Sequence, residues 1–197
     1  MKKILGTIFL TLLVMLAVGV VIGFANKRKT AKTEVNGYNK TVESLVKEDF
    51  KYFDNMAGKV VLYEVRVVMP QAFNIADKFV AQEVCNVFQN TIETKTGFET
   101  TVYFFTHQLN DCNTDVDIHR GAFVLDDKPI EMDSIEVTFD KAFKLAKQSN
   151  YIPSKSRYMT LRHGVGAVDM GLSYWIGNDN YGLMFVDAVT GKVTDKK

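Results

Sequence analysis

KVVLYEVRVVM, residues Lys59–Met69, is the clearest β-strand pattern in the chain. Valine and leucine fill more than half of it, and such side chains fit the pleated surface of a sheet. Gly58 stands directly before the segment and Pro70 directly after it, and both residue types punctuate regular structure. The segment therefore predicts a strand from which the neighbouring elements can be placed in both directions.

Residues 34–57, before this strand, predict an amphipathic helix. Apolar side chains recur there at spacings of three and four, while lysine and glutamate occupy the other positions. The apolar stripe consists of Val35, Tyr38, Val42, Leu45, Val46, Phe50, Phe53 and Met56. Gly58 can end the helix in the left-handed conformation.

After the strand, residues 73–95 predict a second helix, because Ala76, Val80, Val84, Val87 and Phe88 share one helical face. Glu99–His107 then predicts a strand with an aromatic centre. Residues Gln108–His119 read as a polar loop, and Asp126–Pro129 as the turn of a hairpin.

The last third alternates again between a helix and strands. Residues 138–149 predict a helix with Thr138 as its N-cap. Three strand-like segments follow, at 156–163, 172–176 and 181–187. Thr190-Gly191 makes a final turn before Val193.

Helices that interrupt runs of sequence-adjacent strands indicate an α+β fold with an antiparallel sheet. We expect helices packed on that sheet, preceded by an N-terminal transmembrane helix. Because 73–132 and 138–194 both run from a helix into strands, the pattern allows two cystatin-like units. The expected organisation is an anchor or uncleaved signal at 1–25, a basic juxtamembrane segment and amphipathic helix at 26–58, and α+β units at 59–136 and 137–197.

The stretch from Ile4 to Ala25 contains no charged residue. As a helix it would be about 33 Å long, which is enough to cross a hydrocarbon core of about 30 Å. It therefore predicts a single membrane span, with the bilayer as a partner, and a secretory signal is the alternative. The basic residues that flank it, and that we expect at lipid headgroups, are Lys2, Lys3, Lys27, Arg28 and Lys29.

The overall composition excludes several protein classes. The 197 residues are 47% hydrophobic and 24% charged, with a formal net charge of +1. Neither a disordered chain nor a disulfide-dense miniprotein has this composition. A near-neutral charge also argues against nucleic-acid binding, which requires a basic surface to displace counterions.

Cys85 and Cys112, the two cysteines, lack zinc-ribbon or thioredoxin spacing. Outside the cytoplasm they could pair in a disulfide, and inside it they would be thiols. The polar cluster Asp111–His119 fails the calcium-loop test, because Val116 replaces the required glycine. The cluster therefore predicts no metal site.

The glycines after His163 do not form a phosphate-binding loop, because a strand-like segment follows them instead of a helix. Val165, Val168 and Met170 of this loop are instead candidates for contact with a partner. No nucleophile elbow, HExxH or Walker pattern is present. The sequence therefore predicts no catalytic, cofactor-binding or metal-ligating residues.

The C-terminal third resembles a PepSY-like domain. The resemblance rests on the helix FDKAFKLA at 139–146, on Tyr174-Trp175-Ile176, and on the closing hairpin VDAVTGKV at 186–193. Asp187 and Thr190 can cap this hairpin turn, and Gly191 can supply a positive φ. The resemblance implies a small cystatin-like module that is extracytoplasmic and binds or regulates without catalysis. The extracytoplasmic location that the resemblance implies outweighs the positive-inside rule, since the basic residues that follow the span would by themselves favour a cytoplasmic body.

Together these features predict a membrane-anchored, extracytoplasmic binding or regulatory module that contacts a protein or peptide and is not an enzyme. The alternative is a scaffold or assembly component of a membrane-bound secretion or pilus-like machine. A third hypothesis is a hydrolase or metalloprotein that uses His107, His119 or His163.

Overall fold

The computed structural model describes residues 40–53, 60–111, 113–120, 128–149, 155–164, 170–178 and 182–196. The chain divides into two compact units, Met1–Thr33 and Glu34–Lys197, and all described residues belong to the second. None of the helices among the described residues is long and apolar enough to cross a membrane. The predicted span and its basic flanks lie outside these residues, as do the first two residues of the turn predicted at Asp126–Pro129.

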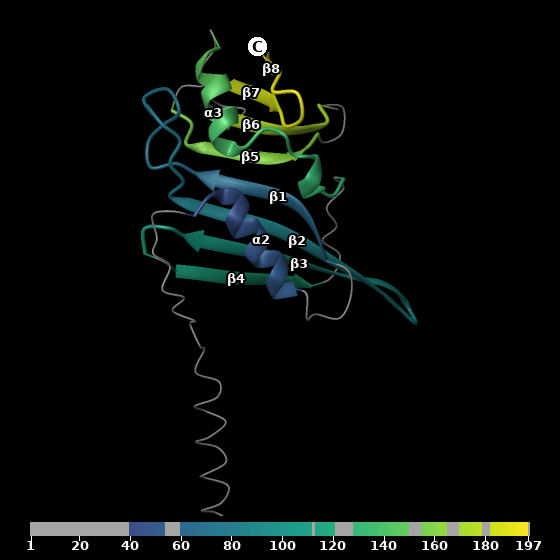
Figure 1. Cartoon of the computed structure of the whole chain (residues 1–197). Coiled ribbons are helices and arrows are strands. Elements are labelled where there is room, and N and C mark those ends of the chain that lie inside the picture. The colour runs from purple at the N-terminus through teal and green to yellow at the C-terminus, as the bar shows by residue number, and fades with distance from the viewer. Residues whose placement is uncertain are drawn as a thin grey trace, which may run out of the picture. The chain divides into compact units, whose positions relative to one another are not determined.

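A single antiparallel sheet of eight strands dominates the second unit (Figure 1). Its order is β4-β3-β2-β1-β5-β6-β7-β8, so β1 lies in the interior and pairs with both β2 and β5. The strands are β1 (Val60–Val68), β2 (Glu83–Thr94), β3 (Gly97–Gln108), β4 (Asn113–Arg120), β5 (Tyr158–His163), β6 (Leu172–Asn178), β7 (Gly182–Asp187) and β8 (Val193–Lys196).

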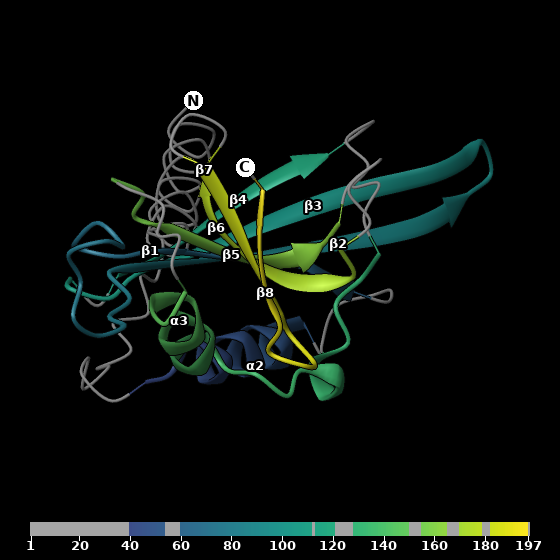
Figure 2. The ribbon, with the colours of Figure 1, turned by 90° about the horizontal axis from the view of Figure 1, so that it is seen from above.

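Two short α-helices, α2 (Val42–Phe53) and α3 (Phe139–Lys147), lie on the same face of the sheet (Figure 2). A 3₁₀ turn, η1 (Met132–Ser134), precedes α3. The helices bury their apolar stripes against the strands, which forms the main core. Its largest fully buried side chains include Tyr174, Phe73, Phe88, Phe143 and Leu62.

The two halves of the sheet repeat one order of elements, a helix followed by four strands. The first repeat runs from α2 to β4 and the second from α3 to β8. They join where β1 pairs with β5, with Val65 opposite Leu161. The second helix is also capped by the first half, because the Glu43 carboxylate accepts a hydrogen bond from the Phe139 backbone N–H at 3.1 Å.

The expected fold class is therefore wrong. Among the described residues, one continuous eight-stranded sheet with only two short helices replaces the predicted layout, in which helices packed on a sheet could form two cystatin-like units. The repeat that the sequence suggested, at 73–132 and 138–194, also starts its first unit at the wrong residue, because α2 is the helix of the first half.

The helix predicted over 73–95 is wrong as well, because Glu83–Thr94 forms β2. Residues 84–90 of this strand are all buried. A strand buried on both faces has apolar residues at odd and even positions, and such a run also satisfies a helical period. The strand's position between β1 and β3, which the local pattern does not contain, decides its structure.

The polar loop predicted over 108–119 is mostly the strand β4. All eight of its residues are exposed. An outer strand buries too little surface to need alternating apolar residues, so the usual sequence signal is weak. The predicted strands at 59–69 and 99–107 and the helix at 138–149 are confirmed, and the helix at 34–57 is confirmed over Val42–Phe53.

Candidate binding edge

Strand β4 ends the sheet on the side of the first half. It pairs with β3 along its whole length, from Gln108 opposite Asn113 to Thr101 opposite Arg120. No strand among the described residues pairs with its other edge. The backbone groups of an outer strand are a template for pairing with another chain.

Alternate side chains of β4 point to opposite faces of the sheet. Thr114 points toward the helices, because its hydroxyl contacts His107, which in turn reaches α2. His119 points to the other face, where its ring packs edge-on against Phe104 with centroids 5.2 Å apart. Val116 and Ile118 therefore share the helix face, and Asp115 and Asp117 share the opposite face.

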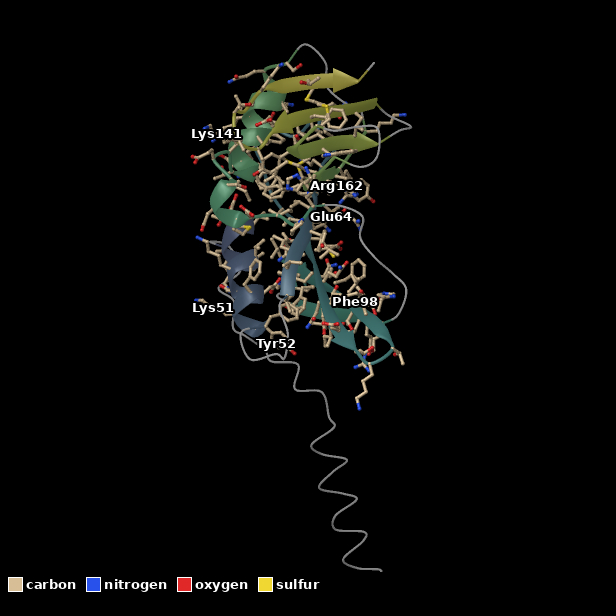
Figure 3. The ribbon with its side chains drawn as sticks, turned by 90° about the vertical axis from the view of Figure 1, so that its right-hand side faces the viewer. Lys51, Tyr52, Glu64, Phe98, Lys141 and Arg162 are labelled. Atoms are coloured by element: carbon tan, nitrogen blue, oxygen red, sulfur yellow. The ribbon has the colours of Figure 1, made fainter. Side chains whose placement is uncertain are left out.

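On the helix face of β4, two exposed apolar side chains lie between Thr114 and Arg120. Val116 is 38% exposed and Ile118 is 47% exposed. Tyr52, at the end of α2, is 58% exposed and packs edge-on against Phe105 at 5.4 Å. Phe105 pairs directly with Val116 in the sheet. Figure 3 shows Tyr52 at the C-terminal end of α2.

The opposite face of β4 carries acidic side chains. Asp117 is 70% exposed at its side chain, and its Oδ2 lies 3.0 Å from His119 Nε2. Asp115 stands two residues before it, on the same face. The cross-strand neighbours of Asp115 and Asp117 on β3 are Thr106 and Phe104, which carry no charge.

A buried polar cluster lies behind this edge and connects α2, β2, β3 and β4. Asp49 of α2 is 5% exposed and accepts a hydrogen bond from Asn86 Nδ2 at 2.6 Å. His107 Nε2 lies 3.1 and 3.0 Å from the two carboxylate oxygens of Asp49. His107 Nδ1 lies 3.1 Å from the hydroxyl of Thr114. The cluster therefore fixes the position of α2 relative to β4.

The order hydroxyl, imidazole, carboxylate also occurs in hydrolases, where it activates a nucleophile. Such a site additionally requires donors that stabilise the oxyanion beside the hydroxyl. A pocket of about 460 Å³ does exist, but residues between Met69 and Val80 line it, on another part of the chain. The contacts of the cluster join α2 to β2, β3 and β4.

The centre of the sheet carries an ion-pair cluster on the face away from the helices. Glu64 Oε2 lies 3.0 Å from Arg162 Nη1, and Glu64 Oε1 lies 2.5 Å from Arg66 Nη2. The Arg162 guanidinium also lies 5.6 Å from the centre of the Trp175 ring. Figure 3 shows Glu64 and Arg162 beside each other. These contacts join β1 to β5 and β6, across the junction of the two halves.

The hairpin between β2 and β3 projects beyond the other strands (Figure 1). Its Phe98 is 77% exposed and Ile92 is 47% exposed. Phe98 is paired with Glu93, so Ile92, the neighbour of Glu93, points to the other face. These two side chains therefore do not form one patch, in contrast to Val116, Ile118 and Tyr52.

The predicted site residues are mostly separate from this edge. Cys85 lies buried in β2, and burial raises the pKa of its thiol. Cys112 lies outside the described residues, so the disulfide stays a prediction. Val165 and Val168 also lie outside them, and Met170 is half-buried just before β6, where its carbonyl accepts a hydrogen bond from Ser173.

The three histidines are not brought together. His107 and His119 point to opposite faces of the sheet, and His163 ends β5. Among the described residues, no group of three or more histidine, cysteine and acidic side chains gathers at one point. The absence of a metal or cofactor site stays a prediction.

Asp49 was missed by the sequence analysis although a signal was present. It stands three residues after Val46 and four before Phe53, so it falls on the apolar stripe of the predicted helix. A carboxylate on a buried stripe requires partners. Its partners, Asn86 and His107, come from strands whose position the local sequence does not reveal.

The chain was compared with protein-family models, with curated proteins and with solved structures. The PepSY-like resemblance of the C-terminal third therefore stays a prediction, since no family model, curated protein or solved structure matches the chain.

Proposed function

We propose that the protein is a membrane-anchored, extracytoplasmic binding module that holds an extended segment of another polypeptide along β4 and has no catalytic activity. The observation that carries the proposal is the strand itself. It is eight residues long and exposed at every position, and the exposed Tyr52 of α2 packs against Phe105, the partner of its Val116.

Addition of a strand to a sheet edge provides binding through the backbone and selectivity through alternate side chains. Sheet proteins commonly shield their edges with short strands, charged side chains, prolines or covering loops. β4 contains no proline, and although Asp115, Asp117 and Arg120 carry charge, the strand presents Val116 and Ile118 on one face. These features support a surface that is completed by a partner.

The buried cluster supports the same reading. Because Thr114 of β4 is connected through His107 to Asp49, the edge is anchored to α2 before a partner arrives. A rigid edge loses less conformational entropy on binding than a mobile one. The uncharged leader and the PepSY-like resemblance support the membrane anchor and the extracytoplasmic location.

The test of strand addition uses the full chain in detergent and a fluorescent octapeptide of alternating threonine and valine. We expect saturable binding. Methylation of the backbone nitrogens along one edge of the peptide should abolish binding, and methylation along the other edge should not, because only one edge pairs with β4.

An Ile118→Lys variant should bind more weakly than wild type, and a matched Ile75→Lys variant, also at an exposed isoleucine, should not. Equal effects of the two methylation patterns would contradict the proposal.

The location has a separate test. The chain is expressed in a bacterial host, and spheroplasts are treated with external protease. We expect digestion of the folded body with an intact inner membrane. Survival of the body under these conditions would refute the extracytoplasmic orientation without bearing on strand addition.

A further inference from the structure

The acidic face of β4 indicates what kind of segment binds there. We propose, resting on the proposed strand addition, that the partner is an extended basic segment with lysine or arginine at every second position and β-branched or aromatic residues between them. The contacts and exposed fractions of the two faces of β4 lead to this partner.

On the face away from the helices, Asp115 and Asp117 stand opposite the uncharged Thr106 and Phe104 of β3, and Asp117 also contacts the His119 ring within β4 at 3.0 Å. A new strand would place its own side chains directly opposite them on the outer side. Opposite charges at such positions stabilise a pair of strands, and like charges destabilise it. A basic residue is therefore favoured opposite each carboxylate.

On the helix face, the same strand would meet an apolar surface. Val116 and Ile118 are 38% and 47% exposed, and Tyr52 of α2 packs against Phe105, the partner of Val116 on β3. Side chains of the partner that lie between its basic residues would point to this face. β-branched or aromatic residues there would remove apolar surface from water on both chains.

A second copy of this chain is a poorer occupant. If two copies of β4 pair antiparallel about a two-fold axis, the helix faces of both copies lie on the same side of the joined sheet. Only registers that place residues of the same face opposite each other are then possible. The two registers of greatest overlap place Asp115 opposite Asp117, or Asp117 opposite its own copy. Both arrangements bring carboxylates together, so the acidic row disfavours self-pairing.

The test compares octapeptides that differ only in charge, with the full chain in detergent. One alternates lysine with valine, and the other alternates glutamate with valine. Two charge pairs predict about a 2- to 30-fold tighter binding of the lysine peptide. A peptide with four lysines followed by four valines has the same composition but cannot alternate, and we expect it to bind more weakly.

Two variants locate the preference on β4. The double substitution Asp115→Asn and Asp117→Asn should reduce the ratio of the affinities for the lysine and glutamate peptides to about one. The double substitution Asp115→Lys and Asp117→Lys should make the glutamate peptide the tighter binder. The exposed residues Asp133 and Glu136 provide the matched control, because replacing both by lysine changes the net charge equally at a distance from β4. Binding of the uncharged threonine–valine peptide by every variant shows that the edge is folded.

The outcomes separate this inference from the proposed function. If the uncharged peptide binds but the lysine peptide has no advantage, or the block peptide binds equally well, the basic partner is wrong and strand addition stands. If wild type forms a dimer that Ile118→Lys dissolves, the partner is a second copy and the inference is overturned. If no alternating peptide binds, both proposals fail.

Discussion

Asp49 lies at the centre of the buried cluster and is the residue on which the position of α2 depends. Its carboxylate accepts hydrogen bonds from Asn86 and His107, two side chains that belong to different strands. A buried carboxylate without partners would be costly, so the cluster is stable only when all its members are in place.

Replacing Asp49 with alanine should lower the free energy of unfolding by about 2–5 kcal/mol, because it leaves buried donors of Asn86 and His107 unpaired. The matched control is Glu48→Ala. Glu48 is its neighbour in α2 and forms an exposed ion pair with Lys40, so the loss should be less than about 1 kcal/mol. Urea unfolding of the full chain, followed by Trp175 fluorescence, measures both values. A similar loss for the two variants would contradict the role of Asp49.

Asp187 provides a pH-dependent contribution at the last turn. Burial acts to raise the pKa of this carboxyl, but hydrogen bonds from Thr190 and Val189 and the charge of Lys192 outweigh burial and hold the pKa below its usual range. The charged carboxylate therefore stabilises the folded chain above the unfolded pKa of about 3.9, and this contribution is lost as pH falls through the lower folded pKa.

Asp187→Asn keeps an oxygen acceptor for the turn and removes the charge. We expect the variant to be less stable than wild type at pH 7, and the difference to shrink as pH falls below about 5. Urea unfolding of both proteins at a series of pH values measures the difference in their free energies of unfolding. A difference that stays constant down to pH 2 would argue that the charge of Asp187 is unimportant.

At the scale of elements, the helix α3 was predictable because its signals are local. Thr138 has extended φ and ψ angles, and its hydroxyl accepts the backbone N–H of Lys141 at 3.3 Å, as an N-cap does. The turn predicted at Thr190-Gly191 is also confirmed, because Gly191 has a φ of +75° and Asp187 accepts the backbone N–H of Thr190. In contrast, the predictions for β2 and β4 are wrong. The centre of β2 is buried on both faces and β4 is exposed on both faces, so neither strand has the alternation of apolar and polar residues that identifies a strand.

Thr138→Ala should lower the free energy of unfolding by about 1 kcal/mol, because the orphan N–H groups at the start of α3 lose their cap. Thr138→Ser keeps the hydroxyl and should remain close to wild type. Urea denaturation midpoints of the three proteins provide the comparison. Equal losses in both variants would indicate that the methyl group, and not the cap, stabilises this position.

At the scale of the whole molecule, the two halves share one sheet. β1 pairs with β2 on one side and with β5 on the other, and the ion pair between Glu64 and Arg162 crosses the same junction. A further contact links the halves on the helix side, where Glu43 of α2 caps α3. We therefore expect the halves to unfold together.

Leu62→Ala tests this coupling. Leu62 is fully buried in β1, and its truncation should cost about 2–5 kcal/mol. Trp175, the single tryptophan, lies in the second half and reports on that half. The transition seen by Trp175 fluorescence should shift to lower urea together with the transition seen by circular dichroism. An unchanged Trp175 transition would show that the halves unfold independently.

The sequence by itself determined the elements whose signals are local: the strand at 60–68, the cap at Thr138 and the closing turn at Asp187. It also predicts an uncharged membrane-length leader, which lies outside the described residues. Only the tertiary structure decided that β2 is a strand, that β4 is an edge, and that Asp49 meets Asn86 and His107. The physical reason is that strand pairing and burial depend on residues distant in the sequence, whereas caps and turns depend on neighbours a few positions away.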